Sequence, residues 1–420
     1  MTLSKRRRWV LFALLLAAAM LNLIDRQIIS VLKPVISRDL GWNDNDYGTL
    51  AAWFQGSAAA AFLLTGWIAD RTGVKWANPL GVLTWSIAAI GHAWAVTMGQ
   101  FTLVRAALGA TEAMGTPSGI KTIATIFPAH QRSTAYGIWN AVGSVGGILA
   151  PLLIPLLAAF YSWRAAFVIA GLAGVVWAGA WLVAVRGVRF DVGAAPSVAT
   201  AYAPILRERP TWAIAFAKAL SDSTWWLMLF WMPDFFHRQF ALEGTALGPP
   251  LAVAYAGAAL GAMIAGALAS RLLVRGRDLD RVRKGAMLVA GLAALPVPLA
   301  LYSESLWGAT AILALTLAGH QAFSTTLYAI IADVTPRAKV GRVTAFGAFC
   351  GNLGGMAIVK VAGAVLAAGL GYLPLFLFAS ISYLLAVAWI QLLLPSIRRA
   401  PQGLENISCP IEGTKDGSRR

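Results

Sequence analysis

The sequence predicts an all-α membrane protein of twelve transmembrane helices in two six-helix bundles. Of its 420 residues, 58% are hydrophobic and only 12% are charged, whereas soluble domains carry about 25% charged residues. The chain divides at its charged and Pro/Gly clusters into apolar segments, each close to the ~20 residues that cross a bilayer. Several motifs recur 200 to 208 positions apart. Composition, segment length and recurrence therefore indicate one duplicated membrane fold.

The twelve predicted spans follow one another with short polar connections. The first starts like a signal peptide, but its apolar run continues through Asp25 and Arg26 to Val35, so we interpret it as a retained helix. The predicted spans are 9–36, 46–69, 76–96, 99–123, 133–160, 164–185, 211–237, 246–271, 284–302, 306–331, 342–368 and 372–395.

The basic residues alternate between the two sides of the predicted membrane. The net charge is +16, and the richest connections hold four basic residues at 5–8 and six at 271–284. The opposite connections hold little more than Lys33, Arg38, Arg164 and Arg238. This alternation follows the positive-inside rule and predicts cytoplasmic termini in the plasma (inner) membrane. The positive charge is then explained by topology and by anionic lipids, without nucleic acid.

A polar, proline-containing connection divides the chain into two halves. The sequence predicts an N-terminal bundle at 1–185, a cytoplasmic linker at 186–210, a C-terminal bundle at 211–396 and a disordered tail at 397–420. The halves echo each other. Residues 66–71 (GWIADR) recur as 266–271 (GALASR), and 143–147 (GSVGG) recur as 351–355 (GNLGG). Duplicated bundles of this kind place a substrate site between them, near the middle of the membrane.

Ionisable residues lie inside the apolar spans of both halves. A charge at the centre of a membrane helix costs roughly 2.5–3.5 kcal/mol on insertion scales, so such residues indicate function. Charges of both signs favour the movement of a charged solute together with protons. The ionisable residues concerned are Asp25, Arg26, Arg105, Glu112, Lys218, Asp222, His320 and Lys360.

The first two pairs have the chemistry of a proton-coupled anion site. Asp25 and Arg26 are adjacent and point about 100° apart around a helix, so each faces a different neighbour. Arg105 and Glu112 are two turns apart on one face, about 10 Å along it. An arginine binds a carboxylate through two hydrogen bonds and keeps its charge. A carboxylate that competes with an anionic substrate for arginine makes a proton-coupled switch; the alternative is a static buried ion pair.

The second half offers possible substrate contacts, each with a structural alternative. Lys218 and Asp222 are four residues apart and could neutralise each other, or they could form a substrate wall with Trp225 and Trp226. His320 could bind hydroxyl groups or be a satisfied core histidine. The remaining candidates for binding hydroxyl or carboxylate groups are Asn140, Asn352 and Lys360.

The connection between the second and third spans has a recognisable pattern. It reads Gly66, Asp70, Arg71, Gly73 and Lys75 and is similar to the signature loop of the major facilitator superfamily. We call these five residues the latch motif. Its aspartate could cap a helix or pair with the other bundle in one conformation and release it in another. Ordinary loop charges are the alternative.

Further motifs resemble the anion:cation symporter family of that superfamily. They are 22–27 (NLIDRQ), 109–113 (GATEA) with Pro117, and 163–167 (WRAAF). The hexuronate branch is suggested by 218–222 (KALSD), Trp225, Trp226, 320–321 (HQ), Lys360 and 372–376 (YLPLF). The chain departs from many sugar-acid members, which carry a tyrosine where Ala58 aligns.

The resemblance implies proton-driven import of an organic anion by rocker-switch alternating access. The cargo would be a sugar acid such as glucuronate or galacturonate. Asp25 and Glu112 would carry protons, and Arg26 and Arg105 would hold the substrate carboxylate. The further contacts implied are Gln55, Asn140, His320, Asn352 and Lys360.

Other functions remain open from the sequence. The chain could transport or exchange another small carboxylate or an organic phosphate, or it could be a sensor that does not transport. We find no Walker loop, no HExxH motif and no arrangement of a nucleophile with a base. The two cysteines, Cys350 and Cys409, define neither a disulfide framework nor a metal site. We therefore expect a monomer that is not an enzyme and has no cofactor and no metal.

Overall fold

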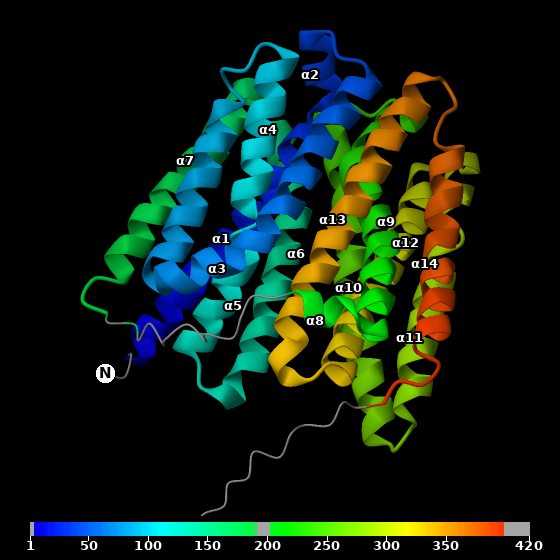
Figure 1. The fold of residues 1–420 in the computed structure, drawn as a ribbon. Coiled ribbons are helices and arrows are strands. Elements are labelled where there is room, and N and C mark those ends of the chain that lie inside the picture. The colour runs from blue at the N-terminus through cyan, green and yellow to red at the C-terminus, as the bar shows by residue number, and fades with distance from the viewer. Residues whose placement is uncertain (1–3, 189, 191–201, 399–420) are drawn as a thin grey trace, which may run out of the picture.

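The computed structural model describes residues 4–188, 190 and 202–398 and shows two helical bundles side by side (Figure 1). The first bundle contains α1 Lys5–Val31, α2 Lys33–Leu40, α3 Asp44–Gly91, α4 Met98–Glu112, α5 Gly115–Ile126, α6 Ala129–Phe160 and α7 Trp163–Ala184. The second contains α8 Ala203–Leu206, α9 Arg209–Phe240, η1 Gly244–Leu247, α10 Gly248–Val274, α11 Leu279–Ala294, η2 Val297–Tyr302, α12 Leu306–Val334, α13 Arg337–Ala367 and α14 Leu373–Leu393.

These helices account for the twelve predicted spans. Within the described residues, seven helical segments are long and apolar enough to cross a membrane: those built on α1, α7, α10, α11, α12, α13 and α14. Helix α3 covers two more spans, because Gly73 interrupts it with a positive φ of 67°. The pair α4 and α5 covers one predicted span with a break at 113–114, and α6 and α9 cover one span each.

The polar connections start several helices with side-chain caps. Asn43 and Asp46 form a capping box at the start of α3, and Thr97 and Gln100 form one at the start of α4. Each box satisfies backbone N–H groups that the first turn of a helix leaves without partners. The helix starts are therefore fixed locally, by the short polar stretches that interrupt the apolar sequence.

The two bundles meet along α3 with α13 and along α6 with α10, with α1 and α9 between these contacts (Figure 1). Small residues allow the closest approach. A Cβ atom added to Gly48 would lie 2.9 Å from Gly363 Cα. We call the end where α1 begins and α14 ends the basic end, and the end near α2 the far end. Gly48 and Gly363 belong to the far end, where the bundles touch most closely.

The packed part of the chain extends beyond the predicted boundary of the second bundle. Ile397 is buried, and its N–H donates to Asp280 Oδ1 over 2.8 Å. Residue 397 is therefore part of the packed bundle and not of the tail predicted from 397. The rest of that predicted tail, 399–420, lies outside the described residues, as does most of the linker predicted at 186–210.

At the far end, α2 is joined to α7 through Asp39. Its carboxylate accepts hydrogen bonds from Trp163 Nε1 at 2.9 Å and Arg164 Nη1 at 3.1 Å, which lower the pKa of Asp39. Because this carboxyl is more acidic in the folded chain, its stabilisation is present above its unfolded pKa of about 3.9 and is lost as the pH falls through the lower folded value. Asp39→Asn should slightly lower the melting temperature at pH 7 and leave it unchanged in strong acid. An equal loss at both pH values would contradict this.

Candidate substrate and proton site

Four ionisable residues from α1 and α4 form a cluster in the middle of the first bundle. Arg26 Nε donates to Glu112 Oε2 at 2.5 Å, and Arg105 Nη2 donates to the backbone oxygen of Arg26 at 3.3 Å. Asp25 lies nearby but bonds to none of them. We call Asp25, Arg26, Arg105 and Glu112 the central cluster. Glu112 pairs with the arginine of α1 and not with Arg105 of its own helix.

The central cluster holds several buried polar atoms without a hydrogen-bond partner among the described residues. They include Nε and Nη1 of Arg105, Oε1 of Glu112 and both carboxylate oxygens of Asp25. Gln55 on α3 is fully buried, and both polar atoms of its side chain are also without a partner. A buried group left unpaired costs about 1–3 kcal/mol. Such groups are typical of a site that completes its bonds with a ligand.

Aromatic rings from both bundles surround the two arginines. The Arg105 guanidinium lies 4.5 Å from the Phe54 ring and 5.7 Å from the Phe230 ring. The Arg26 guanidinium lies 5.7 Å from the rings of Phe54 and Trp226. Phe230 and Trp226 belong to α9, so the second bundle covers the cluster. The rings stabilise the cations by cation–π contact and exclude water.

Close packing of α4 against α3 holds the two arginines beside these rings. A Cβ on Gly109 would lie 2.2 Å from Phe54 O, so only glycine fits there. Helix α4 ends at Glu112, and α5 starts again at Gly115. The break leaves Glu112 at a helix end, turned toward Arg26. The residues 109–113 that carried the family resemblance thus place the carboxylate beside its partner.

A second polar cluster lies inside the other bundle. Lys218 Nζ is 2.7 Å from Asp222 Oδ2, so these two residues of α9 pair along their own helix. A Cβ on Gly351 would lie 2.3 Å from Asp222 Oδ2, which shows how closely α13 approaches the pair. His320 Nδ1 is 2.9 Å from Tyr383 Oη. Lys218 and Asp222 therefore neutralise each other along one helix, which was the alternative to a substrate wall in the sequence analysis.

The two tryptophans that follow this pair, Trp225 and Trp226, contact different clusters. Trp225 stacks on His320 with ring centroids 5.0 Å apart. Trp226 stacks on Phe230 with centroids 6.0 Å apart and lies beside Arg26. Trp226 thus belongs to the surroundings of the central cluster, whereas Trp225 belongs to the cluster inside the second bundle.

Two other candidate contacts, Asn352 and Lys360, do not gather at the central cluster in this conformation. Asn352 is buried and donates to Ala348 O of its own helix at 2.8 Å. Lys360 lies at the far end, where its ammonium donates to Asn45 Oδ1 at 2.7 Å and Thr49 Oγ1 at 2.6 Å. The side chain of Asn140 lies outside the described residues.

The latch motif lies at the basic end, where Gly73 breaks α3. The guanidinium of Arg71 is 4.3 Å from the Trp67 ring, and the ammonium of Lys75 is 5.4 Å from the Trp76 ring. Both are exposed. The structure describes neither the side chain of Asp70 nor the environment of Gly66. The contact between bundles predicted for this aspartate therefore stays a prediction.

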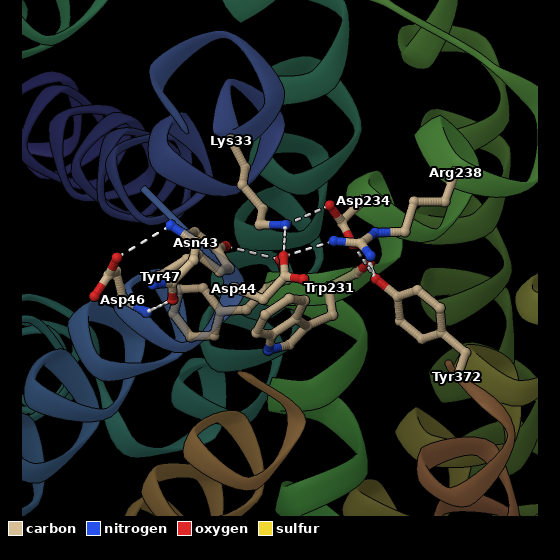
Figure 2. A network of polar contacts seen from close by, with 10 residues as sticks. Lys33, Asn43, Asp44, Asp46, Tyr47, Trp231, Asp234, Arg238 and Tyr372 are labelled. Atoms are coloured by element: carbon tan, nitrogen blue, oxygen red, sulfur yellow. Dashed lines mark hydrogen bonds and ion pairs between the residues drawn. The ribbon is translucent and has the colours of Figure 1, made fainter. Parts of the chain in front are cut away.

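An ion-pair network at the far end joins the two bundles, and the sequence analysis missed it (Figure 2). Lys33 Nζ contacts Asp44 Oδ1 at 2.7 Å and also contacts Asp234 Oδ1. Arg238 contacts Asp44 Oδ1 at 2.6 Å and Asp234 Oδ2 at 2.7 Å. Each cation therefore bridges one carboxylate from each bundle. We call these four residues the far-end quartet.

Neighbouring rings strengthen the far-end quartet. Tyr372 donates from its hydroxyl to Asp234 Oδ2 at 2.5 Å (Figure 2). Nearby, the Tyr47 hydroxyl donates to Phe230 O at 2.8 Å. Lys33 also lies 4.9 Å from the Trp231 ring. The signal available in the sequence was weak: Lys33 and Arg238 stand among the few cations of their side, each near an aspartate.

The polar contacts between the bundles favour one side of the molecule. Among the described residues, the quartet, the Lys360 contacts, the Tyr47 bond and the Arg38–Glu243 pair all lie at the far end. The structure is thus closed at the far end.

Removing one carboxylate of the far-end quartet should shift the conformational equilibrium. Asp234→Asn leaves the buried Lys33 and the partly exposed Arg238 with Asp44 as their single shared carboxylate, and breaking a buried pair such as Lys33–Asp234 costs about 3–5 kcal/mol. We expect the population open at the far end to rise at least tenfold. Distances between spin labels on α2 and η1, measured by double electron–electron resonance, should lengthen. Glu243→Gln removes an exposed pair and is the control; an unchanged distance in Asp234→Asn would contradict a gating role.

Comparison with known proteins agrees with this architecture. The sequence model of the Major Facilitator Superfamily matches residues 15–359 of this chain. The chain belongs to the Major Facilitator Superfamily. It is therefore a transporter and not an enzyme, and an integral membrane protein.

Individual superfamily members resemble the chain over most of its length. It is 28% identical to the hexuronate transporter of Escherichia coli strain K12, across 92% of this chain and 94% of the relative. It is 23% identical to the D-galactonate transporter of Escherichia coli O6:H1, across 94% and 97%.

Solved superfamily structures share the fold. A bacterial homologue of the human lysosomal transporter Spinster, inward-facing and unoccupied, superposes with a TM-score of 0.75 and 21% identity, over 95% of this chain and all of the other. The D-xylose-proton symporter superposes with a TM-score of 0.70 and 14% identity, over 91% and 97%. The predicted fold of two six-helix bundles is thus confirmed.

Proposed function

We propose that this transporter is a proton-coupled symporter that imports a sugar acid, most simply a hexuronate such as glucuronate. The observation that carries the proposal is the fully buried Arg105 next to the Arg26–Glu112 pair. Two of its guanidinium nitrogens have no hydrogen-bond partner among the described residues. The similarity to hexuronate and galactonate transporters supports an acid of this class. The aromatic rings around the arginines suit the apolar faces of a sugar.

The central cluster supports exchange of one carboxylate for another. Glu112 accepts a hydrogen bond from Arg26 through one carboxylate oxygen. Its second oxygen has no partner among the described residues. When Glu112 takes up a proton it loses its negative charge, and Arg26 becomes available to the substrate. The substrate carboxylate then binds between Arg26 and Arg105 with charge-assisted hydrogen bonds. Loss of the proton restores the ion pair and expels the anion.

The closure of the far end supports an assignment of this conformation within the cycle. We propose that the basic end faces the cytoplasm, in keeping with the positive-inside rule, so the far end faces outward. The structure then corresponds to the state after release, with the outer side sealed and the Arg26–Glu112 pair formed. The latch motif would act at the inner side in the opposite state.

The two bundles contribute different parts of the proposed site. The first supplies both arginines and both carboxylates, and the second supplies Trp226 and Phe230 as a cover. His320 and Lys218 lie deeper in the second bundle, and we propose that His320 reaches sugar hydroxyls only after the bundles rock. A single chain contains every element of this site, so the scheme needs only a monomer.

Uptake into proteoliposomes tests the proposal. Purified protein should accumulate labelled glucuronate when the vesicle interior is alkaline, and a protonophore should abolish the accumulation. Galacturonate and galactonate should compete. Saturable exchange without any effect of the gradient would indicate an exchanger. Binding without flux would indicate a sensor, and the absence of glucuronate flux would redirect the search to other organic anions and organic phosphates.

A further inference from the structure

A small polar pocket lies inside the first bundle, between α1, α3, α5 and α6. Its volume is about 90 Å³. Small residues such as Ala18 and Ala19 leave the space open. The polar and aromatic residues that line it are Asn22, Asn78, Trp85, Thr116, Ser118 and Trp139.

Three hydrogen-bond donors of this pocket lack a partner within the described structure. They are Asn22 Nδ2, Trp85 Nε1 and Trp139 Nε1. Asn78, in contrast, donates to Thr122 Oγ1 at 2.8 Å and to Val74 O at 3.0 Å. Polar pockets of this kind hold water, and one molecule occupies about 30 Å³ of the liquid. The pocket volume therefore suits about three water molecules.

Asp25 lies next to two of the residues that line this pocket, Asn22 and Trp85. It follows Asn22 by three residues, so the two lie on one face of α1. The Asp25 carboxylate is beside the Trp85 indole and has no hydrogen-bond partner among the residues that the structure describes, and Asp25 is only 1% exposed. The charged groups around it are Arg26 on α1 and Arg105 and Glu112 on α4. Arg26, in contrast, turns toward Glu112 and is 19% exposed.

The pocket extends from Asp25 toward the basic end. Asn22 is about 4.5 Å nearer that end than Asp25, at 1.5 Å per residue, and Leu15 is about 15 Å nearer. Trp139 lies within the first third of α6, which starts at the basic end. Along α1, the lining residues thus lie between Asp25 and the end that we assign to the cytoplasm.

We propose that this pocket holds a short chain of water molecules that carries the proton of Asp25 to the cytoplasm, by a route separate from that of the sugar acid. The inference rests on the proposed function and deepens it. The O–H bond of the Asp25 carboxyl breaks, the proton passes to the first water, and Asp25 becomes a carboxylate. Asn22, Trp85 and Trp139 orient the water oxygens through their N–H groups.

Filling the pocket tests this route. Ala19→Leu places three additional carbons among the lining residues, and Ala13→Leu makes the same change on the exposed side of the same helix. Proteoliposomes would be assayed for gradient-driven glucuronate uptake, for glucuronate exchange, and for acidification of a pH dye trapped inside. Exchange continues while the proton stays on Asp25, so it should not need the pocket.

We expect Ala19→Leu to slow both uptake and internal acidification at least tenfold while exchange stays within twofold of wild type. Ala13→Leu should match wild type in all three. Trp139→Phe, which keeps an aromatic ring but removes the indole N–H, should slow acidification with exchange intact. These variants fold if they exchange, so a loss of proton release is not a loss of structure.

Two results would overturn the inference alone: acidification by Ala19→Leu at the rate of Ala13→Leu, or equal slowing of exchange and acidification. Wild-type protein that transports glucuronate without any acidification would overturn the proposed proton coupling, and the inference with it. The wild-type measurement therefore separates the two failures before any variant is compared.

Discussion

Arg105→Lys should weaken glucuronate binding by on the order of 30-fold or more and reduce uptake to near background. Lysine keeps the charge but loses the planar fork that binds a carboxylate through two hydrogen bonds. Truncating one partner of a buried charged contact costs about 2–5 kcal/mol, and about 1.4 kcal/mol corresponds to tenfold in affinity. The ammonium of lysine is also smaller than the guanidinium, so it leaves part of the space beside Phe54 and Phe230 empty. Isothermal titration calorimetry of the purified protein measures the change.

The matched control for this substitution is Arg164→Lys. Arg164 pairs with Asp39 on the surface at the far end, and such pairs contribute little. The affinity of the Arg164→Lys variant for glucuronate should stay within twofold of wild type. Affinity of Arg105→Lys within threefold of wild type would show that the substrate carboxylate is held elsewhere. Unchanged melting temperatures for both variants would confirm that the comparison concerns binding.

Glu112→Gln should abolish accumulation driven by a proton gradient while exchange of glucuronate continues. Glutamine resembles the protonated glutamate in shape and charge, so the variant is fixed in the state that admits the substrate to Arg26. Without a proton to lose, it does not restore the ion pair that expels the anion. Uptake with an imposed gradient and counterflow with preloaded vesicles measure the two modes in one preparation.

The separation between the two modes is the decisive result for Glu112. Removal of a partner from a buried ion pair costs about 3–5 kcal/mol, so loss of both modes together would indicate a structural role. Accumulation that persists would assign the coupling proton elsewhere, with Asp25 as the next candidate. Glu243→Gln, at the exposed pair with Arg38, controls for loss of a carboxylate at the far end.

The sequence predicted the fold and the central cluster for physical reasons that can be named. Charges inside apolar spans are costly, so Asp25, Arg26, Arg105 and Glu112 stood out without any knowledge of their contacts. The apolar segments gave all twelve spans, including the two that Gly73 separates within α3. The structure added which partners meet: Glu112 with Arg26, and Asp25 with neither arginine.

The far-end quartet could not be predicted in the same way. Its members stand at the ends of spans, where charges are ordinary, and their pairing depends on how two bundles approach one another. Lys360 shows the same difficulty, because the sequence indicated a substrate contact, whereas its ammonium reaches Asn45 on the other bundle. The pocket beside Asp25 was hidden because its polar residues lie on four separate helices.

The composition of the far-end quartet has an electrical consequence. The first bundle contributes one cation and one anion, Lys33 and Asp44, and the second contributes Arg238 and Asp234. Each bundle therefore carries no net charge from the quartet when it moves. Moving one elementary charge through the membrane voltage is worth about 2.3 kcal/mol per 100 mV, but this closure moves none. As far as the charges of the quartet are concerned, the far end can therefore seal equally well in a polarised or a depolarised membrane.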